Sequence, residues 1–595
     1  MSGRILIAAA GLTLVLTSGC AKWCTEQADR QVYTIIAEKN TKALGRTRAF
    51  TINPPADLSN LLKPPTEKSK EDGASAPAAS TPESAVPPPA PGTGESPAAP
   101  APSAGVATDS GNIPPPLPEP SPSAARLSMA DAMRIAVRAS REYQTQKETV
   151  YLAALVLTFE RYVFQPHPTL VGNPIFTDKD TNDPNMRRTR QWDETAALGV
   201  SQQLADGMMV VGSLGLVALK FLNKELADAV DSTLSFNVTQ PLWRGAGRQV
   251  VQENLTQAER NAVYAVRTFA RFEQTFAVNI AAEYLRVLQQ RDIVMNEYQN
   301  YRSLVENRER AEWLAKAERL PEFQVDQARQ DELRAYNRWV VTRETYENTL
   351  DEFKILLGLP VAREIALDPQ EMDRLAALGL QHPDIGLADA TAMALGKRFD
   401  LMNVRGGLED AQRKVLVAEN GLAGQVDLVA SIGYSSRDDS AQSARLAFHR
   451  GDYSLGLKID LPVDRLTERN ALRRTQVLRE QARRAVDLLQ DNVILDVSRV
   501  FRRLEQARES YENQKLSVRL AERRVDSTQL LLQAGRASQR DVLESQRALV
   551  EARNALTSAL VDHTVAGLEF QRDVGTLVVN EEGQIHGWHL TDNGR

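Results

Sequence analysis

Apolar residues follow two different periods along the chain. In the second half, apolar positions are separated by steps of three or four residues, at Ala482, Ala485, Leu489, Val493, Val497, Val500, Leu504, Ala507 and Tyr511. This spacing places one apolar stripe along an α-helix, which is the seam of a coiled coil. The first half repeats the pattern at Leu255, Ala258, Ala262, Val266, Phe269, Phe272 and Phe276.

Both stripes lie in segments long enough for very extended helices. No proline occurs in residues 245–320 or 463–595. A helix of about 70 residues would be roughly 105 Å long at a rise of 1.5 Å per residue. Because that length exceeds a globular domain, we expect these helices to stand in solvent and to pack only along their seams.

Three shorter segments alternate with a period of two. Apolar and polar side chains take turns in residues 195–201, 234–239 and 452–461. Such alternation is typical of a membrane strand that has lipid on one side and water on the other. Half-buried strands of a small soluble sheet are the alternative interpretation.

The two halves of the chain share an ordered series of short sequence blocks. We therefore predict two homologous repeats, residues 126–360 and 385–578, joined by a connector at 361–384. Each repeat should contain a helix, strands, a very long helix, a tight turn and another helix. The matched blocks begin at Leu127 and Ile385, at Gln240 and Leu461, at Ala317 and Ala534, and at Leu357 and Val574.

This organisation predicts about four strands per chain. Four strands cannot close a barrel, and open strand edges are not tolerated in lipid. Several chains must therefore share one barrel, and three copies would give about twelve strands. The first strand region, at about 170–240, is longer than its counterpart at about 428–461. An extra strand or an external loop is expected there, around residues 178–190.

The first residues resemble a bacterial lipoprotein signal. Arg4 precedes an apolar stretch at 5–16, which has the length of a signal peptide and is too short to span a bilayer. Small residues ahead of Cys20 resemble a lipobox, although Thr17 stands where Leu, Val or Ile is usual. We predict a lipoprotein signal peptide at 1–19 and a covalent lipid, such as palmitate, on Cys20. An ordinary signal peptide cleaved nearby is the alternative.

The N-terminal region continues as a tether. Residues 20–71 should form a lipid-anchored segment that is helical around 26–39, and residues 72–125 are a linker rich in Pro and Ala. Residues 579–595 form a polar C-terminal tail. The chain has two cysteines, Cys20 and Cys24, so a lipid on Cys20 would leave no disulfide.

Composition and motifs exclude several classes of function. The formal net charge is -6, so no basic field attracts nucleic acid. The sequence has no phosphate loop, nucleophile elbow or paired metal-ligand motif. The clustered histidines, His586 and His589, lie in the polar tail. We expect no enzyme activity, no metal and no cofactor, so the energy for any transport must come from a partner.

With these features, the chain resembles the TolC-like outer-membrane efflux family. Within that family it resembles the outer-membrane factors that are lipoproteins. The resemblance rests on residues 238–247, on residues 534–552 and on the duplication. It implies a mainly α fold with a small β part. Long helical coiled coils would form a periplasmic α-barrel, and about four transmembrane strands per chain would join a β-barrel completed by trimerisation. It also implies a periplasmic adaptor, or membrane fusion protein, and an inner-membrane pump as partners.

The resemblance also points to a periplasmic gate. The family's acidic tunnel residues match Asp541 and Glu544, which lie three apart and should share one helix face. Copied threefold, they would form a ring of negative charge that selects cations. Arg536 and Arg540 could hold the tip closed through ion pairs, although the family's gating Arg position matches Ala537. Ordinary solvated coiled-coil charges are the alternative.

The tip turns are the expected docking sites for the adaptor. Gly535 should shape the turn of the second repeat because glycine permits left-handed backbone. Leu320 and Pro321 should play that part in the first repeat. The predicted function is a passive, trimeric exit duct at the outer membrane, extending into the periplasm, for tripartite efflux or type I secretion. A structural coiled-coil envelope lipoprotein without channel activity is the alternative.

Overall fold

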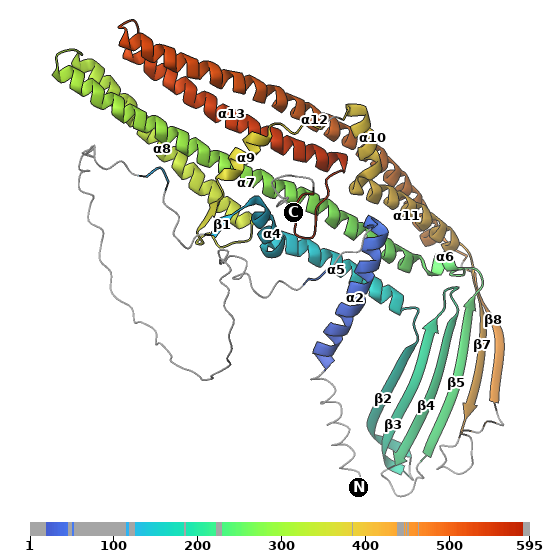
Figure 1. Cartoon of the computed structure of the whole chain (residues 1–595). Coiled ribbons are helices and arrows are strands. Elements are labelled where there is room, and N and C mark those ends of the chain that lie inside the picture. Colours follow the sequence, from blue (N-terminus) through green and yellow to red (C-terminus); the bar gives the residue numbers. More distant parts are fainter. Residues whose placement is uncertain are drawn as a thin grey trace, which may run out of the picture.

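The computed structural model describes residues 20–45, 50–52, 115–117, 125–183, 186–221, 229–383, 385–436, 446, 448, 451–461 and 463–586. The molecule is elongated (Figure 1). Two long helical hairpins extend to one end, a single curved antiparallel sheet forms the other end, and shorter helices pack between them. The predicted signal peptide at 1–19, most of the predicted linker and the end of the predicted polar tail lie outside the described residues.

The helices and strands come in the same order in both halves of the chain. The first half contains β1 (Ala125–Leu127), α4 (Met129–Ala139), α5 (Arg141–Tyr162), β2 (His167–Asp183), β3 (Met186–Gln203), β4 (Met209–Phe221), β5 (Ala229–Pro241), α6 (Arg248–Val251), α7 (Glu253–Lys316) and α8 (Glu322–Leu356). The second half contains α10 (Leu387–Lys397), α11 (Phe399–Gly421), β7 (Gln425–Ser435), β8 (Gly451–Asp460), α12 (Leu466–Gln533) and α13 (Gln539–Val574). Strands β2 and β3 have no counterpart among the described residues of the second half.

Both long helices form where the apolar stripes predict them. Helix α7 has 64 residues and α12 has 68, close to the expected length. Ala258, Val266 and Phe276 of the first stripe are buried, as are Val493 and Leu504 of the second. The stripes are therefore packing seams, along which α7 pairs with α8 and α13, and α12 with α13 and α11.

Local sequence explains where several helices begin. Ser128 caps α4 through a capping box, in which Ser128 and Asp131 satisfy each other's backbone N–H groups. The connector holds this cap in place, because β6 (Ile365–Leu367) pairs with β1 and Glu371 of α9 (Gln370–Leu378) accepts a hydrogen bond from the Met129 amide at 3.0 Å. The beginning of the first repeat is thus tied to the segment between the repeats.

The N-terminal segment is helical over a longer range than expected. Helix α2 (Cys20–Leu44) packs against α5 and α7, and Val32, Ile35 and Ile36 join the main core. Its amino-terminal end points toward the level of the sheet (Figure 1). None of the helices in the described ranges is long and apolar enough to cross a membrane.

The sheet corrects the expected number of strands. In the described ranges, one chain contributes six strands in the order β2-β3-β4-β5-β7-β8, rather than about four. The extra pair is the β2–β3 hairpin, which runs from His167 opposite Ser201 out to the turn after Asp183. Alternation did not reveal β2, because Pro168, Pro174 and a run of charged residues interrupt it. The extended first strand region is thus two additional strands rather than an external loop.

Candidate functional site: a two-faced sheet and the tips of the helical hairpins

One face of the sheet is apolar across all six strands. The register places Leu170, Leu198, Leu214, Leu234 and Tyr434 in one row across β2, β3, β4, β5 and β7. Because directly paired residues point to the same side of a sheet, these side chains share a face. Most are open: Leu198 is 52% exposed and Leu214 43%. A water-exposed surface of this size and composition would be unusual.

The opposite face is mainly polar. It carries Asn173, Asp193, Thr195, Ser213, Thr233, Ser235, Asn237, Ser431, Asp452, Ser454 and Lys458. Serine pairs bridge neighbouring strands, at 2.7 Å between the hydroxyls of Ser213 and Ser235 and 2.6 Å between those of Ser431 and Ser454. The larger apolar exceptions are Val171, Ile175, Met209, Val211, Val217 and Val429. The sheet can therefore face lipid on one side and water on the other.

Aromatic rings mark both borders of the apolar face. Near the outer turns, Phe176 lies 6.1 Å from Trp192, and the hydroxyls of Tyr434 and Tyr453 are 3.0 Å apart. At the border next to the helices, Trp243 is exposed just beyond β5. Such aromatic girdles are typical of strands that cross a membrane.

The strand-to-helix junction is built from the sequence motif at 238–247. After β5, the amide of Leu242 donates to the carbonyl of Val426 at 2.7 Å. Asn420 then clamps the turn, because it accepts from the Gly245 amide at 2.8 Å and donates to the Trp243 carbonyl at 3.1 Å. The motif thereby joins the sheet to the helices of both repeats.

The second tip turn lies between α12 and α13. Gly535 has a left-handed backbone with φ 69°, as expected. The Gly535 amide bonds to the Leu532 carbonyl at 3.0 Å and the Arg536 amide to the Leu531 carbonyl at 2.8 Å. These bonds satisfy carbonyls left free at the end of α12.

The first tip turn corrects one detail of the prediction. Its left-handed residue is Glu318, with φ 57°, rather than Leu320 or Pro321. Glu318 follows Ala317 in the same way that Gly535 follows Ala534. Pro321 instead caps the beginning of α8, where its missing N–H costs nothing. Both turns therefore use one backbone geometry with different residues.

Asp541 is committed to a helix cap. Its carboxylate accepts from the Ser538 amide at 2.8 Å and from the Ser538 hydroxyl at 2.7 Å. These hydrogen bonds lower the pKa of Asp541, so the side chain stays negative at neutral pH. Arg540 is adjacent and contributes to the same shift by charge alone.

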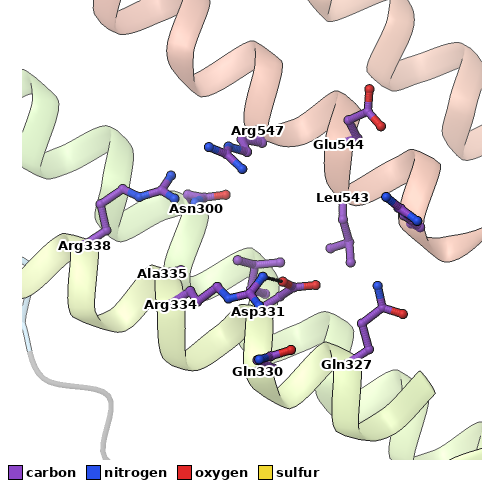
Figure 2. Close-up of a pocket in the computed structure, with 12 residues that line it drawn as sticks. Asn300, Gln327, Gln330, Asp331, Arg334, Ala335, Arg338, Leu543, Glu544 and Arg547 are labelled. Carbon is purple, nitrogen blue, oxygen red and sulfur yellow. Dashed lines mark hydrogen bonds and ion pairs between the residues drawn. The ribbon is translucent and has the colours of Figure 1, made fainter. Parts of the chain in front are cut away.

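Glu544 points away from the first repeat (Figure 2). Its carboxylate pairs with Arg524 of α12 at 2.9 Å, and both side chains are exposed. Asp541 and Glu544 therefore lie on one helix but have separate partners. Within the described part of the chain, Arg536 and Arg540 form no ion pair; the predicted latch has no partner inside one chain.

An arginine-lined cleft separates the two hairpins near their tips. It has a volume of about 520 Å³ and is lined on the α8 side by Arg334 and Arg338 and on the α13 side by Arg540 and Arg547. Figure 2 shows Leu543 pointing from α13 into this space, with Gln327 on the opposite wall. Asp331 neutralises Arg334 at 3.2 Å. The cleft as a whole carries more positive than negative side chains.

Sequence reasoning missed two buried charge networks that join the repeats. In one, Asp573 at the end of α13 accepts from Arg271 of α7 at 2.7 Å and pairs with Arg572 at 2.9 Å. Burial raises the pKa of Asp573, but hydrogen bonds from Arg572 and Arg271 outweigh it and lower that pKa overall. The partners are far apart in sequence, so no local pattern could reveal the contact.

The second network surrounds Asp410 of α11. Its carboxylate accepts hydrogen bonds from the Tyr264 hydroxyl at 2.8 Å and from Arg413 at 2.8 Å, and it pairs with Arg260. Arg413 also reaches Glu253 at 3.0 Å. Asp410 is buried. This network locks α7 to α11 just below the sheet.

A histidine pair lies between the connector and α13. The rings of His382 and His563 are 6.0 Å apart, and His382 is 3.2 Å from Glu505 of α12. Burial, followed by the charges of His382 and Arg508, lowers the pKa of His563 to about 4. No group of three or more metal-ligating side chains occurs among the described residues.

The comparisons with known proteins agree with this geometry. Residues 391–567 match the family described as outer membrane efflux protein. No curated protein matches the sequence significantly. Solved structures share the fold: the outer-membrane channel OprN (TM-score 0.54, 13% identity, 75% of this chain and 89% of that chain), the outer membrane protein VceC of Vibrio cholerae (0.54, 14%, 75% and 96%) and the open state of the MtrE channel of Neisseria gonorrhoeae (0.51, 13%, 75% and 89%).

These matches cover both the sequence of the second half and the architecture of most of the chain. The two-faced sheet and the long hairpins provide the membrane part and the extended part of such a channel. Residues 391–567 therefore belong to the outer membrane efflux protein family, and the chain as a whole has the fold of TolC-like outer-membrane channels.

Proposed function

We propose that three copies of the chain form one passive exit duct. The main support for this proposal is the sheet of a single chain, which has two different faces and two edge strands, β2 and β8, each unpaired on one side. A ring of copies would cover both edges and place the polar face around water. The repeats at 126–360 and 385–578 would each supply strands and a long hairpin to this wall, with 361–384 as connector.

Bilayer recording tests this proposal directly. Purified full-length protein should migrate as a heat-resistant trimer and should conduct ions in a planar bilayer. A monomeric protein, or a trimer without conductance, would contradict the duct and favour a structural envelope lipoprotein.

The anchor is proposed to be a lipid on Cys20. The helix that begins at Cys20 packs on the helical body with its amino-terminal end toward the sheet, so an attached acyl chain would lie near the membrane. Metabolic labelling with palmitate should mark wild type and Cys24→Ser, and should fail for Cys20→Ser. Cys24 is an exposed thiol on the same helix, which makes it a matched control. Label that persists in Cys20→Ser would refute the anchor.

The gate is proposed to depend on Glu544 more than on Asp541. Asp541 already accepts two hydrogen bonds from Ser538, whereas Glu544 has only an exposed ion pair with Arg524. Glu544→Gln should reduce cation preference in bilayer recordings, and Asp541→Asn should change it less. Glu569→Gln, about 37 Å farther along α13 at 1.5 Å per residue, removes the same charge away from the tip. Equal effects at 544 and 569 would contradict a local ring.

The hairpin tips are proposed to receive the periplasmic adaptor, which connects to an inner-membrane pump. Support comes from the exposed turns and from the arginine-lined cleft beside them, which suits acidic side chains. Photo-crosslinkers at Leu320 and Ala537 should capture the adaptor in cells. A crosslinker at Leu488 of α12, which is more exposed than either position but far from the tips, should not. Capture only at Leu488 would contradict tip docking.

A further inference from the structure

The sheet leaves two strands without a partner on one side. Within the described chain, β2 pairs only with β3 and β8 only with β7. Their apolar side chains are correspondingly open: Leu170 of β2 is 81% exposed and Leu455 of β8 75%, against 43% for Leu214 in the middle of the sheet. An edge strand also presents unpaired N–H and C=O groups, which are costly in lipid. Both edges therefore require a partner strand.

We infer that β8 of one copy pairs with β2 of the next copy, so that the trimer closes its sheet with eighteen strands rather than twelve. This inference rests on the trimer of the proposed function. It assigns the β2–β3 hairpin, which has no counterpart in the described part of the second repeat, to the wall of the pore.

Strand direction permits this contact. Every neighbouring pair in the six-stranded sheet is antiparallel. Since the number of strands is even, β2 and β8 run in opposite directions. Placing β8 beside β2 of the next copy therefore continues the antiparallel pattern. The contact joins two different surfaces, and a head-to-tail contact of this kind closes into a ring when the rotation matches.

The side chains of the β2–β3 hairpin also suit a place in the wall of the barrel, between lipid and water. On β3, Trp192, Leu198 and Val200 share the lipid-facing side, whereas Asp193 and Thr195 lie on the polar side. The register puts Leu198 directly opposite Leu214 of β4. The apolar face thus continues from the strands common to both repeats into the additional hairpin.

Prolines on β2 fit its place at the edge of the sheet. Pro168 and Pro174 lie opposite Val200 and Glu194 of β3. A proline cannot donate to a ladder, so it is tolerated where its nitrogen faces the free edge. Both prolines therefore remove donors from the side that would meet β8, and leave Leu170 and Gly172 as donors between them. The seam between copies should have fewer hydrogen bonds than the ladders within one chain.

Two additional strands per copy would widen the pore. With strands about 4.8 Å apart and tilted by about 40°, a closed sheet of eighteen strands has a backbone radius of about 18 Å, against about 12 Å for twelve. Sheets of about this size leave an open aqueous channel in porins. The membrane portal would then admit bulkier solutes than a twelve-stranded one.

Cysteine crosslinking in the full-length trimer tests the seam. In a Cys24→Ser background, Gly172→Cys on β2 is combined with Leu457→Cys on β8, and a short bis-maleimide is added. A Cβ at Gly172 meets no atom within 4 Å, so the substitution fits. Covalent trimers should form with this pair. The comparison pair is Leu214→Cys on β4 with Leu457→Cys, which reports a twelve-stranded ring that excludes the hairpin.

The outcomes separate the inference from the proposed function. Trimers that crosslink only through β4 would overturn the eighteen-stranded seam and leave the exit duct intact. Protein that forms no trimer would refute the duct, and the seam with it. A second variant lacks residues 167–202, whose ends lie together because Gln202 donates to the Phe164 carbonyl at 3.2 Å. Its trimer should exclude smaller polyethylene glycols than wild type does from the outer side; an unchanged limit would contradict a hairpin in the wall.

Discussion

Protonation of His563 should make the protein acid-sensitive. His563 is 2% exposed, and burial, followed by the neighbouring charges of His382 and Arg508, lowers its pKa to about 4. Glu505, which pairs with His382, acts in the opposite direction but does not outweigh them. In the unfolded chain the pKa is about 6.5. At a pH between these two pKa values, His563 is mostly protonated in the unfolded chain and mostly neutral in the folded chain.

The sign of the effect follows from this difference. Stability from neutral His563 is fully present above pH 6.5 and is lost as the pH falls toward 4. For a pKa of about 4 in the folded state and about 6.5 in the unfolded state, the loss between pH 7.5 and pH 5.0 is about 2 kcal/mol per chain. Other carboxylates and histidines add their own pH dependence, so the test must isolate this residue.

The free energy of unfolding can be measured by urea unfolding of the detergent-solubilised protein, monitored by circular dichroism at both pH values. Comparison with variants then isolates the contribution of His563. His563→Gln cannot titrate, so its loss of stability between pH 7.5 and 5.0 should be about 2 kcal/mol smaller than that of wild type. His382→Gln removes a neighbouring charge but leaves the burial, and should retain most of the wild-type loss. If wild type and His563→Gln lose the same free energy, the reasoning about His563 is wrong.

Three further predictions concern stability and use the same unfolding assay. Asp410→Ala should cost about 2 kcal/mol because it removes the buried carboxylate that accepts from the Tyr264 hydroxyl and pairs with Arg260 and Arg413. Glu409→Ala, at its exposed neighbour, should cost below about 1 kcal/mol; equal losses would contradict the network. Glu318→Gly should stabilise and Gly535→Ala should destabilise, each by about 1 kcal/mol, because both positions have positive φ; the opposite signs would refute the shared turn geometry. Trp339→Phe keeps an aromatic ring but removes the hydrogen bond from the indole N–H to the Pro116 carbonyl at 3.1 Å and part of a buried ring, and should cost about 1 kcal/mol or more. Trp339→Ala should cost about 3 kcal/mol or more, and an unchanged stability of Trp339→Phe would show that the linker contact contributes nothing.

The long helices could be predicted because both the spacing of their apolar residues and the lack of proline indicate a helix along their whole length. Stripes such as Val493, Val497 and Leu504 continue without proline, so periodicity alone determines the helix and its buried side. Strands β5 and β8 alternate cleanly for the same reason, since lipid and water select opposite side chains. Strand β2 escaped prediction because Val171 and Ile175 make it apolar on both faces and two prolines interrupt it.

The sequence indicated where the candidate gate residues lie, but not which side chains they contact. A spacing of three placed Asp541 and Glu544 on one helix, but their partners decide what each carboxylate can do. Ser538 lies close in sequence, and a Ser-x-x-Asp pattern could have revealed the cap. Arg524, by contrast, belongs to the preceding helix. The partners of Asp410 and Asp573 are still more distant, so only the packed repeats bring them together.

The open edges have a consequence for how the channel forms. Strand β8 has 10 residues, and in an edge strand about half of the backbone groups point away from the sheet. In lipid, each unpaired group costs several kcal/mol, so one chain inserted alone would carry a penalty far above the roughly 5–15 kcal/mol that stabilises an ordinary protein. The helical part carries no such penalty, because its backbone groups are hydrogen-bonded within each helix and its buried charges Asp410 and Asp573 are paired within one chain. The helical body can therefore fold before assembly, whereas insertion of the sheet requires partner chains. Assembly and membrane insertion should then occur as one coupled step, and variants that block the β2 edge should accumulate as folded but uninserted protein.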